Sequence, residues 1–133
     1  MSLRSLPPLL RSEPALASVS GRRAATLAVP EPARALTLAA LATLSDRRPL
    51  VVAAPTTGDA ERLVADLEAY LGPDQVELFP AWETLPFERV SPAPETMGRR
   101  LRTMWRLRHG QATVVVAPVR ALVQRLGPHV EDV

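Results

Sequence analysis

Four short apolar runs alternate along this chain with segments whose hydrophobic residues recur at helical spacing. The runs cover residues 24–29, 50–54, 75–79 and 113–117, and the helical patterns cover residues 33–44, 57–71, 91–109 and 118–126. Strands that alternate with helices and are apolar on both faces indicate a parallel sheet that is covered by helices on both sides. With right-handed crossovers, the sequence therefore predicts an α/β fold, a three-layer αβα sandwich with a mainly parallel sheet.

The chain has the length of one domain, with 133 residues. Residues 1–20 are rich in Pro, Ser and Leu, and we expect a short helix or turn packed on the domain, or a partly ordered leader. Residues 21–133 form the α/β domain. No apolar run reaches the roughly 18–20 residues that span a bilayer, and there is no cysteine for a disulfide or thiolate metal site. We expect a cytoplasmic protein with no membrane partner.

The loop after the first apolar run is the place to look for a ligand, because open parallel sheets bind ligands beyond the carboxyl ends of their strands. A phosphate-binding P-loop there needs glycines whose backbone N–H groups wrap the phosphates, a lysine, and a hydroxyl for Mg²⁺. This chain instead has Val29, Pro30, Glu31, Pro32, Ala33, Arg34, Ala35 and Leu36.

The chemistry of this loop argues against nucleotide hydrolysis. Pro30 and Pro32 have no N–H, Glu31 adds negative charge where a phosphate would lie, and the chain contains no lysine, since all 16 basic residues are arginine. We expect a degenerate P-loop, with no cofactor and no catalytic residue. Arg34 could contact an anion, but its guanidinium does not replace the compact ammonium of a P-loop lysine.

Five arginines gather on the helical segment 91–109: Arg99, Arg100, Arg102, Arg106 and Arg108. Three of them, Arg99, Arg102 and Arg106, share one helix face. The opposite face carries apolar residues that we expect to pack on the core, Met97, Leu101, Met104 and Trp105. A solvated helix face is the favoured interpretation, since the net charge is only +2 and no Asn or Gln is interleaved to read bases. The alternative is a nucleic-acid-binding module that contacts DNA phosphates through residues 99–108.

The segment 79–92 contains three large apolar residues, Trp82, Leu85 and Phe87, and its prolines exclude regular structure. We favour a role in covering the end of the sheet, and the alternative is an exposed anchor for another domain. His109 and His129 have no second ligand at metal spacing, so we predict no metal site.

Together these segments resemble the N-terminal region of bacterial transcription-repair coupling factors, which are large ATP-driven translocases. The motif Trp82-Glu83-Thr84-Leu85-Pro86-Phe87 leads through Ser91-Pro92 and Glu95 to Arg99-Arg100-Leu101. It is joined by Val116-Ala117-Pro118-Val119 and by Leu122-Val123-Gln124-Arg125-Leu126 with Pro128-His129. The resemblance runs from about residue 21 to the end of the sequence.

The resemblance implies a degenerate RecA/helicase-like domain, similar to domain 1a of the excision-repair subunit UvrB, in which residues 29–36 correspond to a lost P-loop. It implies a parent protein that uses ATP to release stalled RNA polymerase at DNA lesions and recruits UvrA to nucleotide-excision repair. It also implies that this fragment is a non-catalytic structural and interaction domain, whose partners are other domains of the parent, with UvrA and RNA polymerase bound elsewhere. A weak DNA contact is the remaining expectation for this segment, because it lacks the aromatic hairpin that UvrB uses to hold DNA.

Overall fold

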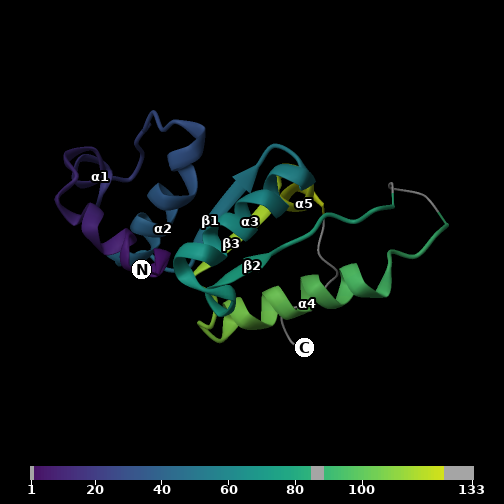
Figure 1. The fold of residues 1–133 in the computed structure, drawn as a ribbon. Helices are drawn as coiled ribbons and strands as arrows, with labels where there is room; N and C mark the ends of the chain where they lie inside the picture. Colours follow the sequence, from purple (N-terminus) through teal and green to yellow (C-terminus); the bar gives the residue numbers. More distant parts are fainter. Residues whose placement is uncertain (1, 85–88, 125–133) are drawn as a thin grey trace.

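The computed structural model of this chain describes residues 2–84 and 89–124, which fold around a three-stranded parallel sheet (Figure 1). The strands are β1 (Leu50–Ala54), β2 (Val76–Leu78) and β3 (Val114–Pro118), in the order β1-β3-β2. Val116 of β3 is in register with Val52 of β1 and Leu78 of β2. All five residues of β3 are buried, because it has a neighbour on each side and helices over both faces.

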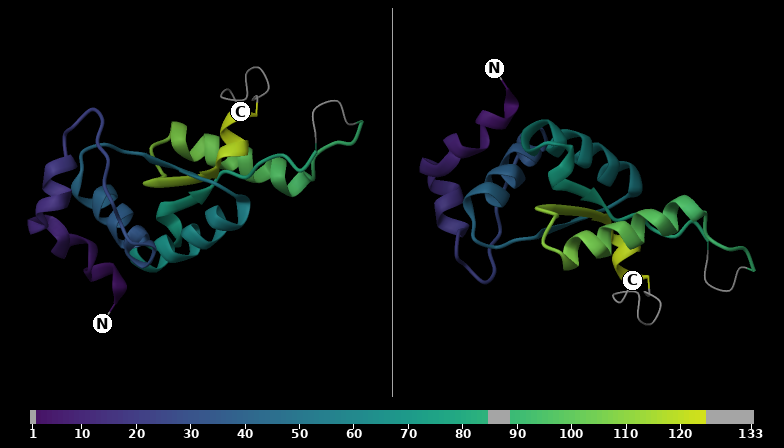
Figure 2. Two further views of the ribbon diagram at one scale, coloured as in Figure 1. Left: turned by 90° about the horizontal axis from the view of Figure 1, so that it is seen from above. Right: turned by 90° about the horizontal axis from the view of Figure 1, so that it is seen from below.

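Helices cover the two faces of the sheet, α3 on one and α4 with α5 on the other (Figure 2). The helices are α1 (Pro14–Val19), α2 (Arg34–Leu44), α3 (Thr57–Leu71), α4 (Pro94–Arg108) and α5 (Val119–Val123). Four 3₁₀ turns complete the secondary structure: η1 (Leu3–Ser5), η2 (Pro7–Ser12), η3 (Glu31–Ala33) and η4 (Pro73–Gln75). The α/β sandwich predicted from the sequence is confirmed.

The larger hydrophobic cluster lies between the sheet and the pair α2 and α3. It contains Val114 and Val116 of β3, Leu67 of α3, and several alanines, including Ala39 and Ala42 of α2. Small side chains let two helices approach each other closely, which explains how α2 packs against α3 with so little bulk. A second cluster, around Val115 and Ala117 of β3, lies under α4 and α5.

Residues 2–20 form η1, η2 and α1, and these turns pack on the domain. Pro7 and Leu16 are buried, and η2 lies against α2. The described residues of this segment thus form short helical turns in contact with α2 and α3.

The first predicted strand is wrong. Residues 24–29 form no strand and pair with no strand among the residues that the structure describes. Leu27 and Val29 are half-buried and line a groove whose other wall includes Val52 of β1, so open space separates this segment from the nearest strand edge. An apolar run becomes a strand only when a free edge is within hydrogen-bonding distance, and periodicity does not reveal that distance.

Two helix starts also differ from the prediction. The N-cap of α4 is Ala93 and not Ser91, and Pro118 ends β3 instead of beginning α5. The predicted end of α5 at residue 126 lies outside the described residues. None of the described helices is long and apolar enough to cross a membrane.

Candidate functional site

The loop 29–36 folds into a closed turn at the start of α2. The N–H of Ala33 donates to the carbonyl of Pro30 at 2.9 Å, and the N–H of Arg34 donates to the carbonyl of Glu31. Pro30 and Pro32 have no N–H to donate. Four of the five residues 30–34 therefore offer no free N–H, whereas a P-loop presents a row of such groups to the phosphates.

The side chains of this loop point to two environments. Ala35 is buried, and Val29, Ala33 and Leu36 are half-buried. The exposed members are Pro30, Glu31, Pro32 and Arg34. The charged groups are thus in solvent at the edge of a groove and are not enclosed within a pocket.

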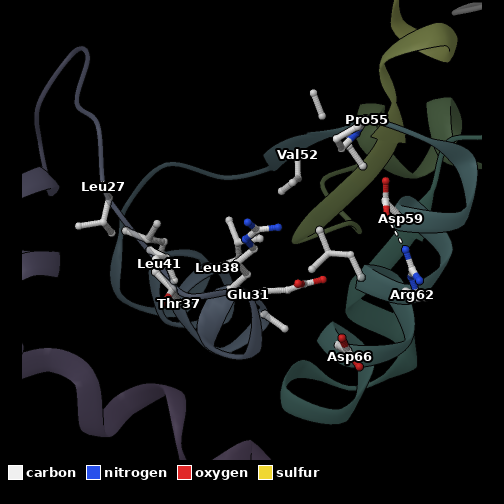
Figure 3. Close-up of a pocket in the computed structure, with 16 residues that line it drawn as sticks. Leu27, Glu31, Thr37, Leu38, Leu41, Val52, Pro55, Asp59, Arg62 and Asp66 are labelled. Atoms are coloured by element: carbon white, nitrogen blue, oxygen red, sulfur yellow. Dashed lines mark hydrogen bonds and ion pairs between the residues drawn. The ribbon is translucent and has the colours of Figure 1, made fainter.

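A groove of about 620 Å³ lies beside this loop, between α2 and the carboxyl end of β1 (Figure 3). Its charged lining consists of Glu31, Asp59, Asp66, Arg34 and Arg62. Three carboxylates against two guanidinium groups make this lining a poor environment for a triphosphate, which carries several negative charges. The remaining lining is mostly apolar, with Leu38 and Val52 facing each other across it.

Asp59 is held in its ionised form at the edge of this groove. The hydroxyl of Thr56 donates to one carboxylate oxygen of Asp59 at 2.7 Å, and Arg62 forms an ion pair with the other oxygen. The Thr56 hydrogen bond and then the Arg62 contacts lower the pKa of Asp59 below its ordinary value of 3.8. Arg62 therefore already has a carboxylate partner.

The arginines on α4 are also paired with protein groups. Arg99 contacts Glu95 at 2.9 Å, and Arg102 contacts Glu77 of β2 at 3.4 Å. Arg106 forms an ion pair with the same Glu77 carboxylate and also donates to the backbone carbonyls of Asp74 and Gln111. The side chains of Glu77 and Arg106 are only 9% and 12% exposed. The three arginines predicted to form a stripe thus neutralise two carboxylates, and Arg106 is largely withdrawn from solvent.

The predicted core face of α4 is wrong in orientation. Met97, Leu101 and Trp105 are 38%, 39% and 44% exposed. The buried residues of this helix are instead Thr96, Arg100 and Thr103. Only Met104 of the predicted face packs on the second hydrophobic cluster. The helix is rotated because Arg102 and Arg106 are held at Glu77 and because Thr103 donates to the Leu78 carbonyl, which brings polar side chains to the sheet.

The burial of Arg100 could not be predicted from the sequence, which places this residue among four other arginines on one helix. Its side chain is 2% exposed, and its Cζ atom lies 4.1 Å from the ring centroid of Phe79 and 4.4 Å from that of Trp82. Nη1 donates to the Pro80 carbonyl at 2.7 Å, while Nε and Nη2 have no hydrogen-bond partner in the described structure. Burial lowers the pKa of the Arg100 guanidinium. The contacts of Arg100 fasten the segment after β2 to α4, and this arginine does not face a nucleic acid.

Trp82 belongs to the same contact and is half-buried. The backbone N–H of Trp82 donates to Oε1 of Gln124 at 2.7 Å, and Nε2 of Gln124 donates to the backbone carbonyl of Trp82 at 3.4 Å. The next residue, Glu83, accepts a hydrogen bond from Thr96, which lowers the pKa of Glu83. The two hydrogen bonds of Trp82 join its backbone to the side chain of Gln124 at the end of α5. Leu85 and Phe87, the other two predicted anchors, lie outside the described residues.

Among the described residues, His109 is not brought together with acidic groups at a common site. His109 stacks on Trp105 with ring centroids 4.3 Å apart, and its Nδ1 lies 2.8 Å from the Trp105 carbonyl. His129 lies outside the described residues. Within residues 2–84 and 89–124, no group of three His, Asp or Glu side chains is arranged to hold a metal ion.

Comparisons with known proteins give a consistent result. No family model matches the chain. It is similar to transcription-repair-coupling factors from several bacteria. That of Mycobacterium tuberculosis (strain CDC 1551 / Oshkosh) is 42% identical over 110 residues, which cover 77% of this chain and 9% of the relative. That of Escherichia coli (strain K12) is 38% identical over 82 residues, or 61% of this chain and 7% of the relative.

The similarity extends to a relative of lower sequence identity. The transcription-repair-coupling factor of Bacillus subtilis (strain 168) is 33% identical over 96 residues, which cover 72% of this chain and 8% of the relative. The chain therefore spans less than a tenth of the length of the curated relatives that it matches, and it aligns with an N-terminal region of them.

Proposed function

Because this chain belongs to the transcription-repair-coupling factor family and corresponds to an N-terminal region of its members, we propose that it is a non-catalytic structural and interaction domain of such a protein. In this proposal the longer protein uses ATP to release stalled RNA polymerase and recruits UvrA to nucleotide-excision repair in the cytoplasm. The present domain supports those modules and packs against them, and it binds no nucleotide itself.

The observation that carries the proposal is the closed turn at residues 30–34. Two prolines have no N–H, and the N–H groups of Ala33 and Arg34 are used within the turn. The carboxylate of Glu31 is exposed at the same place, and the chain has no lysine. A β,γ-phosphate needs converging donors and a compact cation, and this turn provides neither. On this basis we regard the domain as a RecA-like fold that has lost its ATP site.

The DNA-binding alternative has less support, since Arg99 is paired with Glu95, and Arg102 and Arg106 are paired with Glu77. Phosphate binding would require Arg102 and Arg106 to leave Glu77, which would then be a buried carboxylate without its counter-ions. That cost opposes binding.

Calorimetry with Mg·ATP, together with a phosphate-release assay on the 133-residue chain, tests the proposal. We expect no heat of binding at micromolar to millimolar nucleotide, and no turnover above the buffer rate. Two variants locate any weak anion binding that appears. Arg34→Ala removes the cation at the turn, and Arg47→Ala removes an exposed arginine in the connection between α2 and β1. Micromolar affinity with turnover, lost in Arg34→Ala and retained in Arg47→Ala, would overturn the proposal.

A further inference from the structure

One face of the sheet is covered unevenly. Val51 and Ala53 of β1 are in register with Val115 and Ala117 of β3, so all four side chains lie on the face that carries α4 and α5. Val115 and Ala117 are 3% and 0% exposed, whereas Val51 is 54% exposed and Ala53 is also exposed. The helices therefore cover this face over β3 and leave it open over β1.

The apolar side of α4 is turned toward the uncovered strand. On one flank, Arg102 and Arg106 reach Glu77 of β2, which is the strand farthest from β1. On the other flank, Met104 packs on the cluster under β3. Met97 and Leu101 continue outward from the Met104 flank on the β1 side, and Trp105, which stacks on His109, lies farther round the helix toward solvent.

We call these four residues, Val51, Ala53, Met97 and Leu101, the β1–α4 apolar face. The short helix α5 follows β3 at the carboxyl end of the strands and contacts both β1 and β3 (Figure 2). It adds the exposed side chains of Val119 and Leu122 to this side. The remaining exposed large hydrophobics of the described chain are Leu3 and Leu9 near the N-terminus, Val90 before α4, and Val123 at the end of α5. Apolar surface gathered on one side in this way marks an interaction site.

We propose that the β1–α4 apolar face binds an amphipathic helix supplied by the part of the transcription-repair-coupling factor that this chain does not span. The inference rests on the proposed function, which it deepens by naming the surface and its occupant. The face of a parallel sheet is covered by helices, since strands add only at its edges. A helix beside α4 would lie over β1 and pack its apolar stripe against Met97 and Leu101 at a spacing of about 8–10 Å.

The size of the face favours a segment of the same polypeptide over a second copy of the chain. A stable dimer buries about 800 Å² and 20–30 residues on each partner, far more than these four side chains offer. In contrast, a helix in the same polypeptide needs only a small complementary stripe, because its effective concentration is high. The 110 aligned residues are 9% of one relative and the 82 aligned residues are 7% of another, so the relatives are roughly nine times as long as this chain and such a segment is available.

Thiol labelling of single-cysteine variants tests this proposal, and the absence of cysteine from this chain makes the design clean. Leu101→Cys reports on the apolar face, and Arg99→Cys is the matched control on the opposite flank of the same helix, where the side chain is 55% exposed. Each substitution is placed in a full-length protein that contains this chain and in the 133-residue chain. Maleimide modification of the α4 peptide is followed by mass spectrometry.

In the native full-length protein, we expect maleimide to modify Leu101→Cys at least tenfold more slowly than Arg99→Cys. In urea, the two cysteines should be modified at equal rates. In the dilute 133-residue chain both cysteines should react quickly. Equal rates in the native full-length protein would overturn the proposal. Slow labelling of Leu101→Cys in the 133-residue chain would also overturn the proposal, because the chain would then cover the face without the rest of the protein. Protection that depends on concentration would mean that a second copy of the chain covers the face in a dimer. Nucleotide turnover is measured separately, so failure of the proposed function can be distinguished from failure of this inference.

A second pair of variants does not depend on thiol chemistry. Leu101→Glu should leave the melting temperature of the 133-residue chain unchanged and lower that of the full-length protein by several degrees. Leu9→Glu, at a 65% exposed position on η2, should change neither. No loss with Leu101→Glu in the full-length protein would contradict a buried apolar contact at this face.

Discussion

Glu77 lies on the α4 side of the sheet, and its ion pairs stabilise the contact between β2 and α4. It is a carboxylate in the middle of β2, 9% exposed, and it is the counter-ion of both Arg102 and Arg106. Removing one partner of a buried ion pair leaves an uncompensated charge, which costs about 3–5 kcal/mol. We expect Glu77→Gln to lower the free energy of unfolding by about 3 kcal/mol, since Arg106 keeps two carbonyl contacts, and urea denaturation measures this change.

The control for this prediction is Glu95→Gln on the same helix. The Glu95–Arg99 pair is exposed on both sides, and such pairs contribute less than about 1 kcal/mol. If the two substitutions cost the same, the Glu77 cluster does not hold α4 on the sheet. The rotation of α4 would then need another cause.

Arg100 shows how a single residue can join two segments. Its guanidinium contacts the rings of Phe79 and Trp82, each worth about 0.5–2 kcal/mol in a desolvated site, and donates to the Pro80 carbonyl. A helical-wheel argument assigns every arginine to solvent and therefore misses this contact. Burial of a charge depends on partners that lie elsewhere in the chain, here twenty residues away.

Helix α3 begins with a cap that the sequence marks clearly. Thr56 is the N-cap, its side chain accepts from the N–H of Asp59 at 3.1 Å, and its hydroxyl donates to the Asp59 carboxylate. At the other end, Gly72 has φ +96°, a conformation that favours glycine, and a Cβ there would lie 3.2 Å from the Arg4 side chain. Because both signals are local, the predicted range 57–71 matches Thr57–Leu71.

We expect Thr56→Ala to lower the free energy of unfolding by about 1 kcal/mol, the usual cost of losing an N-cap side chain. The Thr56 hydrogen bond is the main cause of the lowered pKa of Asp59, so the substitution should also raise that pKa toward 3.8. Ionised Asp59 stabilises the native state above the unfolded pKa, and this contribution is lost as pH falls through the lower folded pKa. In the variant the acid loss is therefore smaller, and it is complete at a higher pH.

Carbon-13 NMR titration of the Asp59 carboxyl and urea denaturation at pH 7 and at pH 3 measure these two effects. Thr57→Ala is the control, since Thr57 is the first helical residue and its side chain makes no cap contact. A normal Asp59 pKa in the parent chain would show that the Thr56 hydroxyl does not favour the ionised carboxyl.

The elements of this fold could be predicted where their signals are local, and the arrangement of the elements could not. The apolar run 50–54 matches β1, and the valines at 114–116 identify β3, since β-branched residues favour strands. The run 24–29 is also apolar and forms no strand, because pairing depends on a free sheet edge. In the same way, the closed turn at residues 30–34 follows from its prolines, whereas the buried position of Arg106 depends on Glu77 in a distant strand.

Net charge and charge pairing together decide how the whole molecule should respond to nucleic acid. The formal net charge is +2, and Arg99, Arg102 and Arg106 already neutralise Glu95 and Glu77. Each phosphate contact on duplex DNA contributes about −0.9 to the slope of log K against log salt. We expect the 133-residue chain to bind duplex DNA weakly, with a slope no steeper than about −3, as measured by fluorescence anisotropy between 50 and 200 mM salt. In Arg99→Ala/Arg102→Ala, which leaves the buried Arg106 in place, the slope should change by less than about one unit. A slope of −5 or steeper that becomes shallower by about two units in this variant would instead establish α4 as a DNA-binding helix. The arginines would then have exchanged their carboxylate partners for phosphates.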